Sequence, residues 1–132
     1  MRAVSIPIAA ALLAAPAAAQ APRVPVPLIA TEGIGACSTA YVYNLAGTDG
    51  FLSVRAAPSR RARVLARLVE GQNVYACVRR GDWFGIVFEQ GNSRRCAEVL
   101  ETRRTTGVYR GPCRSGWVHE RYLGGYADWV SP

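Results

Sequence analysis

Two short stretches of the sequence, about sixty residues apart, decide the fold. Residues 51–59 read Phe-Leu-Ser-Val-Arg-Ala-Ala-Pro-Ser, and residues 115–123 read Ser-Gly-Trp-Val-His-Glu-Arg-Tyr-Leu. Each joins a short apolar alternating run, typical of a β-strand, to a turn. Because further apolar runs and turn residues lie between them, we expect one small, closed β-barrel and an all-β fold.

Residues 1–19 predict a secretory signal peptide. Arg2 supplies a positive start, residues 6–15 form an apolar run too short for a permanent membrane anchor, and residues 17–19 form a small-residue cleavage site. The prolines inside the segment argue against a buried alanine-rich helix. We therefore expect a periplasmic or secreted mature protein without a membrane span.

Four cysteines follow the signal segment: Cys37, Cys77, Cys96 and Cys113. An even number in an exported chain indicates two disulfides, each of which stabilises a small domain by about 2–5 kcal/mol. Four cysteines allow three pairings, and the sequence alone does not choose among them. Because there is no Cys-x-x-Cys pair and His119 is the single histidine, we expect no metal site and no cofactor.

Every basic side chain of the protein is arginine, a composition that a GC-rich genome also produces. Without Arg2, fifteen arginines stand against nine acidic residues, an excess of six. This excess favours anionic partners such as phospholipid headgroups, wall polymers or acidic proteins. Nucleic acid is not an expected partner, because the chain is exported and lacks the compact basic-aromatic motifs of nucleic-acid binders.

The chain after the signal segment divides into three parts. Residues 20–39 are rich in proline and predict an extended arm that is flexible or loosely docked. Residues 125–132 form a tail with aromatic residues that are apolar enough to dock on the domain. The barrel lies between them, at residues 40–124, with strands expected at residues 40–45, 51–55, 74–79 and 83–88 and an apolar stretch at residues 64–69.

Two of these strands carry apolar residues on both faces. Alternation along residues 74–79 places Val74, Ala76 and Val78 opposite Tyr75 and Cys77. Along residues 83–88 it places Phe84, Ile86 and Phe88 opposite Trp83, Gly85 and Val87. A strand with one face in water would alternate apolar with polar residues. We therefore expect the polar, arginine-rich residues 89–112 or the C-terminal tail to fold over the Phe84, Ile86 and Phe88 face; an exposed face would instead be a partner site.

The order of these motifs resembles the bacterial SH3 (SH3b) domain family over about residues 40–124. The matching positions are Leu52, Val54, Arg55, Pro58, Ser59, Val64, Leu65, Leu68, Gly71, Val74, Trp83, Val87, Gly116, Trp117, Val118, Tyr122 and Leu123, with Phe84 in place of a family tyrosine. The resemblance implies a partly open barrel of five to six strands. It also implies an envelope protein that binds wall peptides or other proteins.

The chain departs from the family pattern between Trp83 and Trp117. Family members cover this distance in about a dozen residues, and here it takes thirty-four. We treat residues 89–112 as an insertion. From this comparison with the family, we expect a Cys96–Cys113 disulfide to hold the insertion in place. We expect the other disulfide to join Cys37 to Cys77.

The sequence does not favour catalysis. A Cys-His nucleophile needs a free thiolate, and oxidised cysteines do not provide one. A Ser-His-Asp site would combine His119 with Ser115 and either Asp82 or Asp128, but no Gly-x-Ser-x-Gly turn positions the serine. Glu98 and Glu101, on an expected helical turn at residues 96–101, are more typical of a solvated face than of a catalytic carboxylate pair.

The resemblance instead points to ligand binding in an aromatic groove, as in the eukaryotic relatives of the family. It implies groove positions for Trp83 and Tyr122, with His119 where those relatives carry a proline. It also implies that Arg55 donates to a loop carbonyl, and we expect Trp117 to pack in the structure. The excess of arginine favours an anionic ligand, for which we predict further contacts from Arg94, Arg95, Phe84 and Phe88.

These observations predict a monomeric, non-catalytic, exported binding module of the cell envelope. Its expected partner is a cell-wall peptide or an envelope protein. An alternative from another class is a secreted inhibitor or effector that blocks an enzyme through the arginine-rich insertion.

Overall fold

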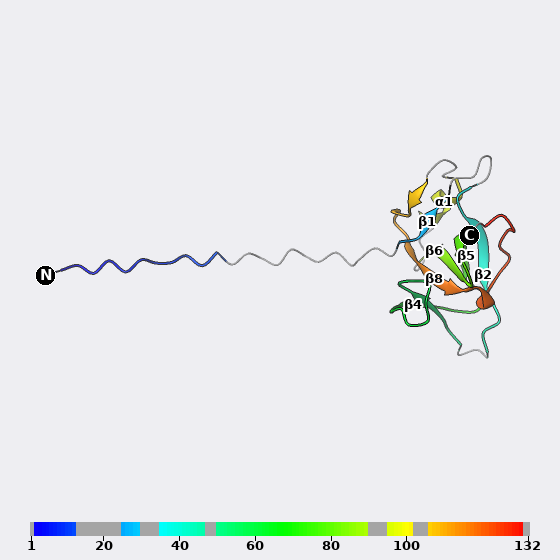
Figure 1. Cartoon of the computed structure of the whole chain (residues 1–132), viewed down its shortest axis with the longest axis horizontal. Coiled ribbons are helices and arrows are strands. Elements are labelled where there is room, and N and C mark those ends of the chain that lie inside the picture. The colour runs from blue at the N-terminus through cyan, green and yellow to red at the C-terminus, as the bar shows by residue number, and fades with distance from the viewer. Residues whose placement is uncertain are drawn as a thin grey trace.

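The computed structural model describes residues 2–12, 25–29, 35–46, 50–89, 95–101 and 106–130. The described chain is all-β, as expected, with a seven-stranded and a two-stranded antiparallel sheet (Figure 1). The helical part comprises the 3-10 turns η1 (Arg95–Ala97) and η2 (Glu120–Tyr122) and the short helix α1 (Glu98–Glu101).

The large sheet contains more strands than expected and is not closed. Its strands, in spatial order, are β4 (Val64–Leu68), β3 (Leu52–Arg55), β8 (Arg114–His119), β6 (Trp83–Phe88), β5 (Asn73–Arg80), β2 (Ser38–Val42) and β9 (Leu123–Gly124). The apolar stretch after residue 63 forms β4 by pairing with β3, and the chain after η2 adds β9 against β2. These two additions bring the sheet to seven strands and leave β4 and β9 as its edges.

The inner face of this curled sheet encloses the main core. Residues from all seven strands meet there, including the fully buried Val42, Val54 and Val118. Phe84, Ile86 and Phe88 also point into this core and are at most 2% exposed. The expected cover from the C-terminal tail is present as well, because the Tyr126 ring lies 4.5 Å from the Phe84 ring and Val130 is buried.

A second core lies on the outer face of β6, beside Gly85 and Val87. Cys96, Val99 and Tyr109 of the insertion pack there together with Leu28 of β1 (Pro27–Leu28), which pairs with β7 (Gly107–Val108). Trp117 is buried in this cluster, and its indole N–H donates to the Pro25 carbonyl oxygen over 3.2 Å. The expected packing role of Trp117 is thus confirmed. The described part of the insertion packs on this outer face, so the expectation that it folds over the Phe84 face is wrong.

The N-terminal arm is docked on the domain wherever it is described. Val26, Leu28 and Ala36 are at most 4% exposed, and the Tyr109 amide donates to the Val26 carbonyl oxygen over 2.9 Å. The prediction of a flexible or loosely docked arm is therefore wrong for residues 25–29 and 35–39. The arm can lie this close because Gly85 has no side chain. A Cβ at that position would lie 3.0 Å from the Val26 side chain.

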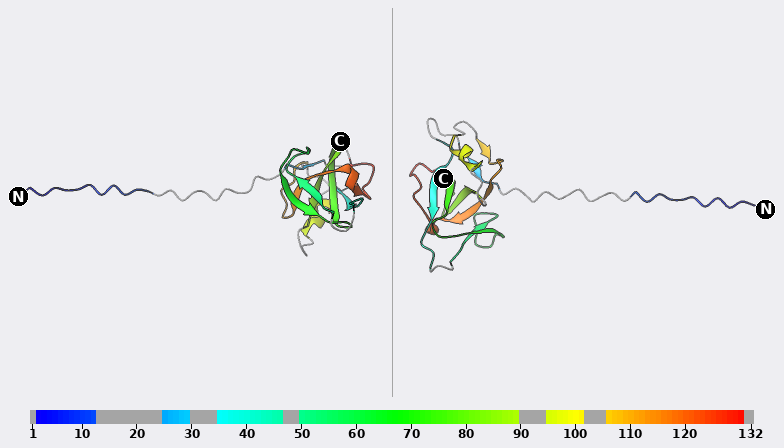
Figure 2. Two further views of the ribbon diagram at one scale, coloured as in Figure 1. Left: turned by 90° about the horizontal axis from the view of Figure 1, so that it is seen from below. Right: turned by 180° about the vertical axis from the view of Figure 1, so that it is seen from behind.

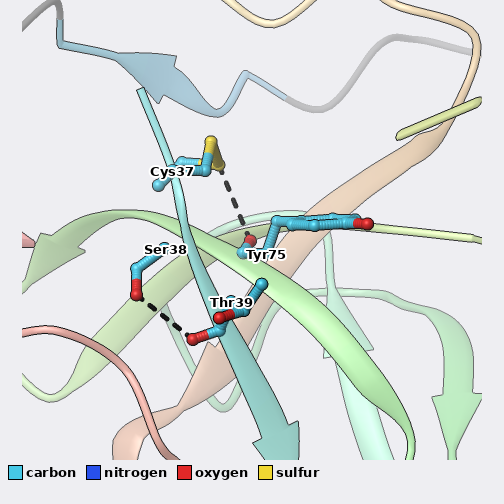
Figure 3. The surroundings of a disulfide bond; sticks show 5 residues. Cys37, Ser38, Thr39 and Tyr75 are labelled. Atoms are coloured by element: carbon cyan, nitrogen blue, oxygen red, sulfur yellow. Dashed lines mark hydrogen bonds between the residues drawn. A yellow bond between two sulfur atoms is a disulfide. The ribbon is translucent and has the colours of Figure 1, made fainter. Parts of the chain in front are cut away.

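Two disulfides fasten the second core to the sheet. Cys37 is bonded to Cys77, which joins the start of β2 to β5 (Figure 3), and Cys96 is bonded to Cys113, which joins η1 to the residue before β8. This is the pairing expected from the family pattern. The disulfides close separations of 40 and 17 residues, and loop-closure entropy gives contributions of about 4 and about 3 kcal/mol.

A β-bulge in β5 changes which residues face each core. The β5–β6 register shifts between Ala76 and Val78, so Cys77 is an additional residue on β5. Val74 and Ala76 face the main core as expected, but Val78 lies with Cys77 in the second core. Simple alternation therefore predicts the wrong face for Val78.

The tail is fixed to the sheet through Ser38, which is a buried polar residue. Its hydroxyl oxygen accepts the Ala127 amide over 2.9 Å and donates to the Thr39 carbonyl oxygen over 3.1 Å (Figure 3). At the other end of the chain, residues 2–12 contain no helix or strand and are exposed. Residues 13–19, with the expected cleavage site, lie outside the described part. No described helix is long and apolar enough to cross a membrane.

Candidate functional site

The candidate site is a groove of about 570 Å³ on the outside of the large sheet. One side is formed by β3 and its flanking residues, including Phe51, Ser53 and Arg55. The other side is formed by the start of β6 and the chain that leaves β8 through η2. Figure 1 and the right-hand view of Figure 2 show β1, α1 and β7 at one end of the domain and the β3–β4 hairpin at the other.

Three rings line the groove in a row. Trp83 and His119 are paired across β6 and β8, with ring centroids 5.3 Å apart and planes inclined by 78°. The His119 and Tyr122 centroids are 6.3 Å apart. All three side chains are half-buried, so each leaves part of its ring open to a ligand. The structure thus brings together Trp83 and Tyr122, the two aromatic positions expected to bind a ligand.

The turn that carries Tyr122 is held by short local contacts. His119 caps η2, because its Nδ1 accepts the Arg121 amide over 3.2 Å. The Tyr43 amide donates to the Tyr122 carbonyl oxygen over 3.0 Å. An ion pair between Arg79 and Glu120 joins β5 to the same turn. These contacts fix the relative positions of the three rings before any ligand arrives.

The groove is also lined by arginine. Arg55 Nη1 donates to the Ala62 carbonyl oxygen over 3.0 Å, which confirms its expected role as a donor to a loop carbonyl. Arg60 and Arg121 are exposed at the groove margin. None of the described residues that line the groove is acidic. Planar guanidinium groups donate two parallel hydrogen bonds to a carboxylate, so the lining suits an anionic ligand.

Sequence reasoning missed Phe51 and the arginines beside it. Phe51 is 55% exposed, and the Arg67 guanidinium carbon lies 5.9 Å from its ring centroid. The signal was available as a charge count. Residues 51–69 contain five arginines and no acidic residue, whereas the insertion at residues 89–112 contains five arginines and three glutamates. The hairpin, and not the insertion, is therefore the most basic part of the domain.

Two of the predicted ligand contacts lie in the main core and do not join the groove. Phe84 and Phe88 are 0% and 2% exposed in the main core, so the prediction that they contact a ligand is wrong. The run of apolar residues on both faces of β6 is typical of a strand buried on both faces. Arg94 lies outside the described residues. Arg95 begins η1, and Cys96 beside it is buried in the second core.

The residues considered for catalysis are not assembled. Ser115 and His119 lie four residues apart along β8, a separation of about 13 Å for an extended strand. They pair with Val87 and Trp83 of β6, respectively. Glu98 and Glu101 bound α1, beside the second core. Across residues 25–29, 35–46, 50–89, 95–101 and 106–130, no three His, Cys, Asp or Glu residues are grouped to hold a metal ion.

One titratable group outside the groove has a shifted pKa. Burial raises the pKa of the Tyr75 hydroxyl above its ordinary value, and the negative charge of Glu89 raises it further. Tyr75 lies on β5 and packs against the second core. The shift therefore reflects packing of the tyrosine beside the insertion.

Comparison of the chain with protein-family models, with curated proteins and with solved structures finds no match.

Proposed function

We propose that this chain is an exported, non-catalytic binding module of the SH3b kind that recognises an anionic peptide in the cell envelope. The observation that carries the proposal is the convergence of Trp83, His119 and Tyr122 with arginine side chains in one groove. The ligand is a cell-wall peptide, whose free carboxylates suit this lining.

Two physical effects support this ligand class. Partly exposed aromatic rings bury apolar peptide surface and lose little conformational entropy, because each has few rotatable bonds. Exposed arginines at the margin attract a carboxylate and orient it through paired N–H donors. The local contacts around η2 hold the rings in place, so little ordering remains to oppose binding.

The groove is a better candidate than the insertion for the main binding surface. The insertion residues Cys96, Val99 and Tyr109 are at most 6% exposed and pack with Val87 in the second core. This packing role favours a ligand module over an inhibitor that acts through the insertion. The two disulfides favour an oxidising compartment, which agrees with a periplasmic or secreted location.

The test is retention of the purified mature chain on peptidoglycan. We expect retention that falls with added salt and that drops about five- to thirty-fold in Trp83→Ala and in Tyr122→Ala, the range typical of an aromatic contact residue. Tyr43→Ala is the matched control, because Tyr43 is 42% exposed and lies outside the groove lining. Absence of retention, together with a tight one-to-one protein complex that both groove variants still form, would overturn the proposal.

A further inference from the structure

The positive charge of the domain is concentrated on one hairpin. Residues 51–69, which include β3 and β4, contribute five of the six excess positive charges that remain without Arg2. The rest of the chain then has ten arginines and nine acidic residues, so it is close to neutral. A positive patch of this kind produces a local field that the net charge of a whole domain does not describe.

The register of the hairpin places apolar and basic side chains on one outward face. Ser53 pairs with Arg67, and Arg55 pairs with Val64 after the bulge between Val54 and Arg55. Paired residues point to the same side of a sheet, and the core side is taken by residues such as Leu52 and Leu68. The outward face therefore carries Arg55, Arg67 and Val64.

Continuing the same register pairs Phe51 with Val69 on that outward face. Phe51, Val64 and Val69 are 55%, 42% and 51% exposed. Three large apolar side chains thus lie in water beside the arginines of a single hairpin. If this face met only solvent, the arrangement would be a disadvantage, because exposed apolar groups on an edge strand promote aggregation.

Four arginines of the hairpin and its loop are available to a partner. Arg60, Arg61, Arg63 and Arg67 are exposed, and none of them forms a salt bridge among the described residues. Two arginines elsewhere on the sheet are engaged with protein groups. Arg79 pairs with Glu120, and Arg114 donates to the Leu65 carbonyl oxygen over 2.8 Å.

We infer that the outward face of the β3–β4 hairpin docks on an anionic phospholipid surface. Guanidinium groups bind lipid phosphates, and the negative surface potential attracts a cluster of arginines. Phe51, Val64 and Val69 then enter the interfacial region, as apolar side chains of peripheral membrane proteins do. A soluble anionic polymer satisfies the arginines but offers no apolar medium to these three side chains. A membrane interface accounts for both features of the face.

This inference goes beyond the proposed function and does not depend on it. Phe51, Arg55 and Arg60 belong both to the hairpin face and to the groove, so docking would hold the groove next to the membrane. Arg61, Arg63, Val64 and Val69 do not line the groove. Variants at these four positions test the hairpin and leave the groove residues unchanged.

The experiment is co-sedimentation of the oxidised mature chain with phosphatidylcholine vesicles that contain or lack phosphatidylglycerol. We expect binding only to the anionic vesicles, with a loss at high salt. Arg61→Gln with Arg63→Gln should weaken binding about twenty-five-fold, since each arginine near an anionic surface contributes about a factor of five. Arg80→Gln with Arg110→Gln, which removes the same charge from exposed positions outside the hairpin, should weaken it much less.

A second pair of variants separates a membrane from a soluble polyanion. Val64→Ser with Val69→Ser leaves the charge unchanged, and exposed valines are not needed for the core. We expect this double variant to lose vesicle binding several-fold while its binding to soluble polyphosphate stays unchanged. Equal binding to both kinds of vesicle, equal losses in the two arginine pairs, or unchanged vesicle binding in the valine variant would each overturn the inference.

Discussion

Trp83 and His119 face each other across β6 and β8, with the ring planes nearly perpendicular. Trp83 follows the β5–β6 turn, and His119 ends β8 and caps the turn that carries Tyr122. One cross-strand pair therefore joins the two parts of the chain that bracket the groove. Its edge-to-face geometry is favourable for two rings and keeps both orientations fixed.

His119 has two separable roles, as a ring in the groove and as the cap of η2. His119→Asn replaces the Nδ1 acceptor by an amide oxygen and removes the ring, whereas His119→Ala removes both. We expect both variants to lose binding to peptidoglycan. The alanine variant alone should lose about 0.5–1 kcal/mol of stability, measured by urea unfolding. Full binding by His119→Asn would show that the ring does not contribute to the groove.

Gly85 permits the close packing of the N-terminal arm. A Cβ at this position would lie 2.7 Å from Val78 Cγ1 and 3.0 Å from Val26 Cγ1. We expect Gly85→Ala to destabilise the domain by about 1–3 kcal/mol, because overpacking displaces these neighbours. The arm should also become sensitive to limited proteolysis. Unchanged stability with a protected arm would contradict the docking of residues 25–29 on β6.

The two disulfides should differ in their contribution to stability. Loss of the Cys37–Cys77 bond, by serine at both positions, should cost about 4 kcal/mol, and loss of Cys96–Cys113 about 3 kcal/mol. Urea unfolding of the two double variants measures the difference. A non-reducing peptide map serves as the control for pairing. Any peptide that joins Cys37 to Cys96 or to Cys113 would contradict the structure.

Tyr75 should make the domain less stable at alkaline pH. Because burial and then Glu89 raise the pKa of its hydroxyl in the folded state, the neutral form is favoured on folding. This contribution is complete below the ordinary tyrosine pKa of about 10 and is lost as the pH rises through the folded pKa. We expect Tyr75→Phe to retain more of its neutral-pH stability at alkaline pH than the wild type does. Parallel pH profiles of unfolding would contradict this.

The sequence predicted the strands whose own residues form a clear apolar pattern, and it did not predict those that depend on contacts with distant residues. The bounds of β6 agree with the expected strand at residues 83–88, because a run rich in aromatic and β-branched residues between turn residues specifies it. Alternation failed at Val78, where a bulge adds a residue. The strands β1 and β7 have two residues each and form only because the arm docks beside Gly85. The sequence of either short strand does not indicate that contact, because it joins residues that are distant along the chain.

The groove was predictable in part, from the family resemblance. That resemblance implied groove positions for Trp83 and Tyr122. Phe51, Arg60 and Arg121 reach the groove through the pairing of β3 with β4 and β8 and through the path of η2. Their positions depend on tertiary register, which the composition of any one segment does not specify.

The most direct test of the groove is chemical-shift mapping of the labelled mature chain during titration with soluble peptidoglycan fragments. We predict the largest shifts at the Trp83 indole N–H and at the amides of His119 and Tyr122. Residues 96–101 of the insertion should remain unchanged. Shifts confined to the insertion, with no change at Trp83 or Tyr122, would contradict the assignment of this groove as the ligand site.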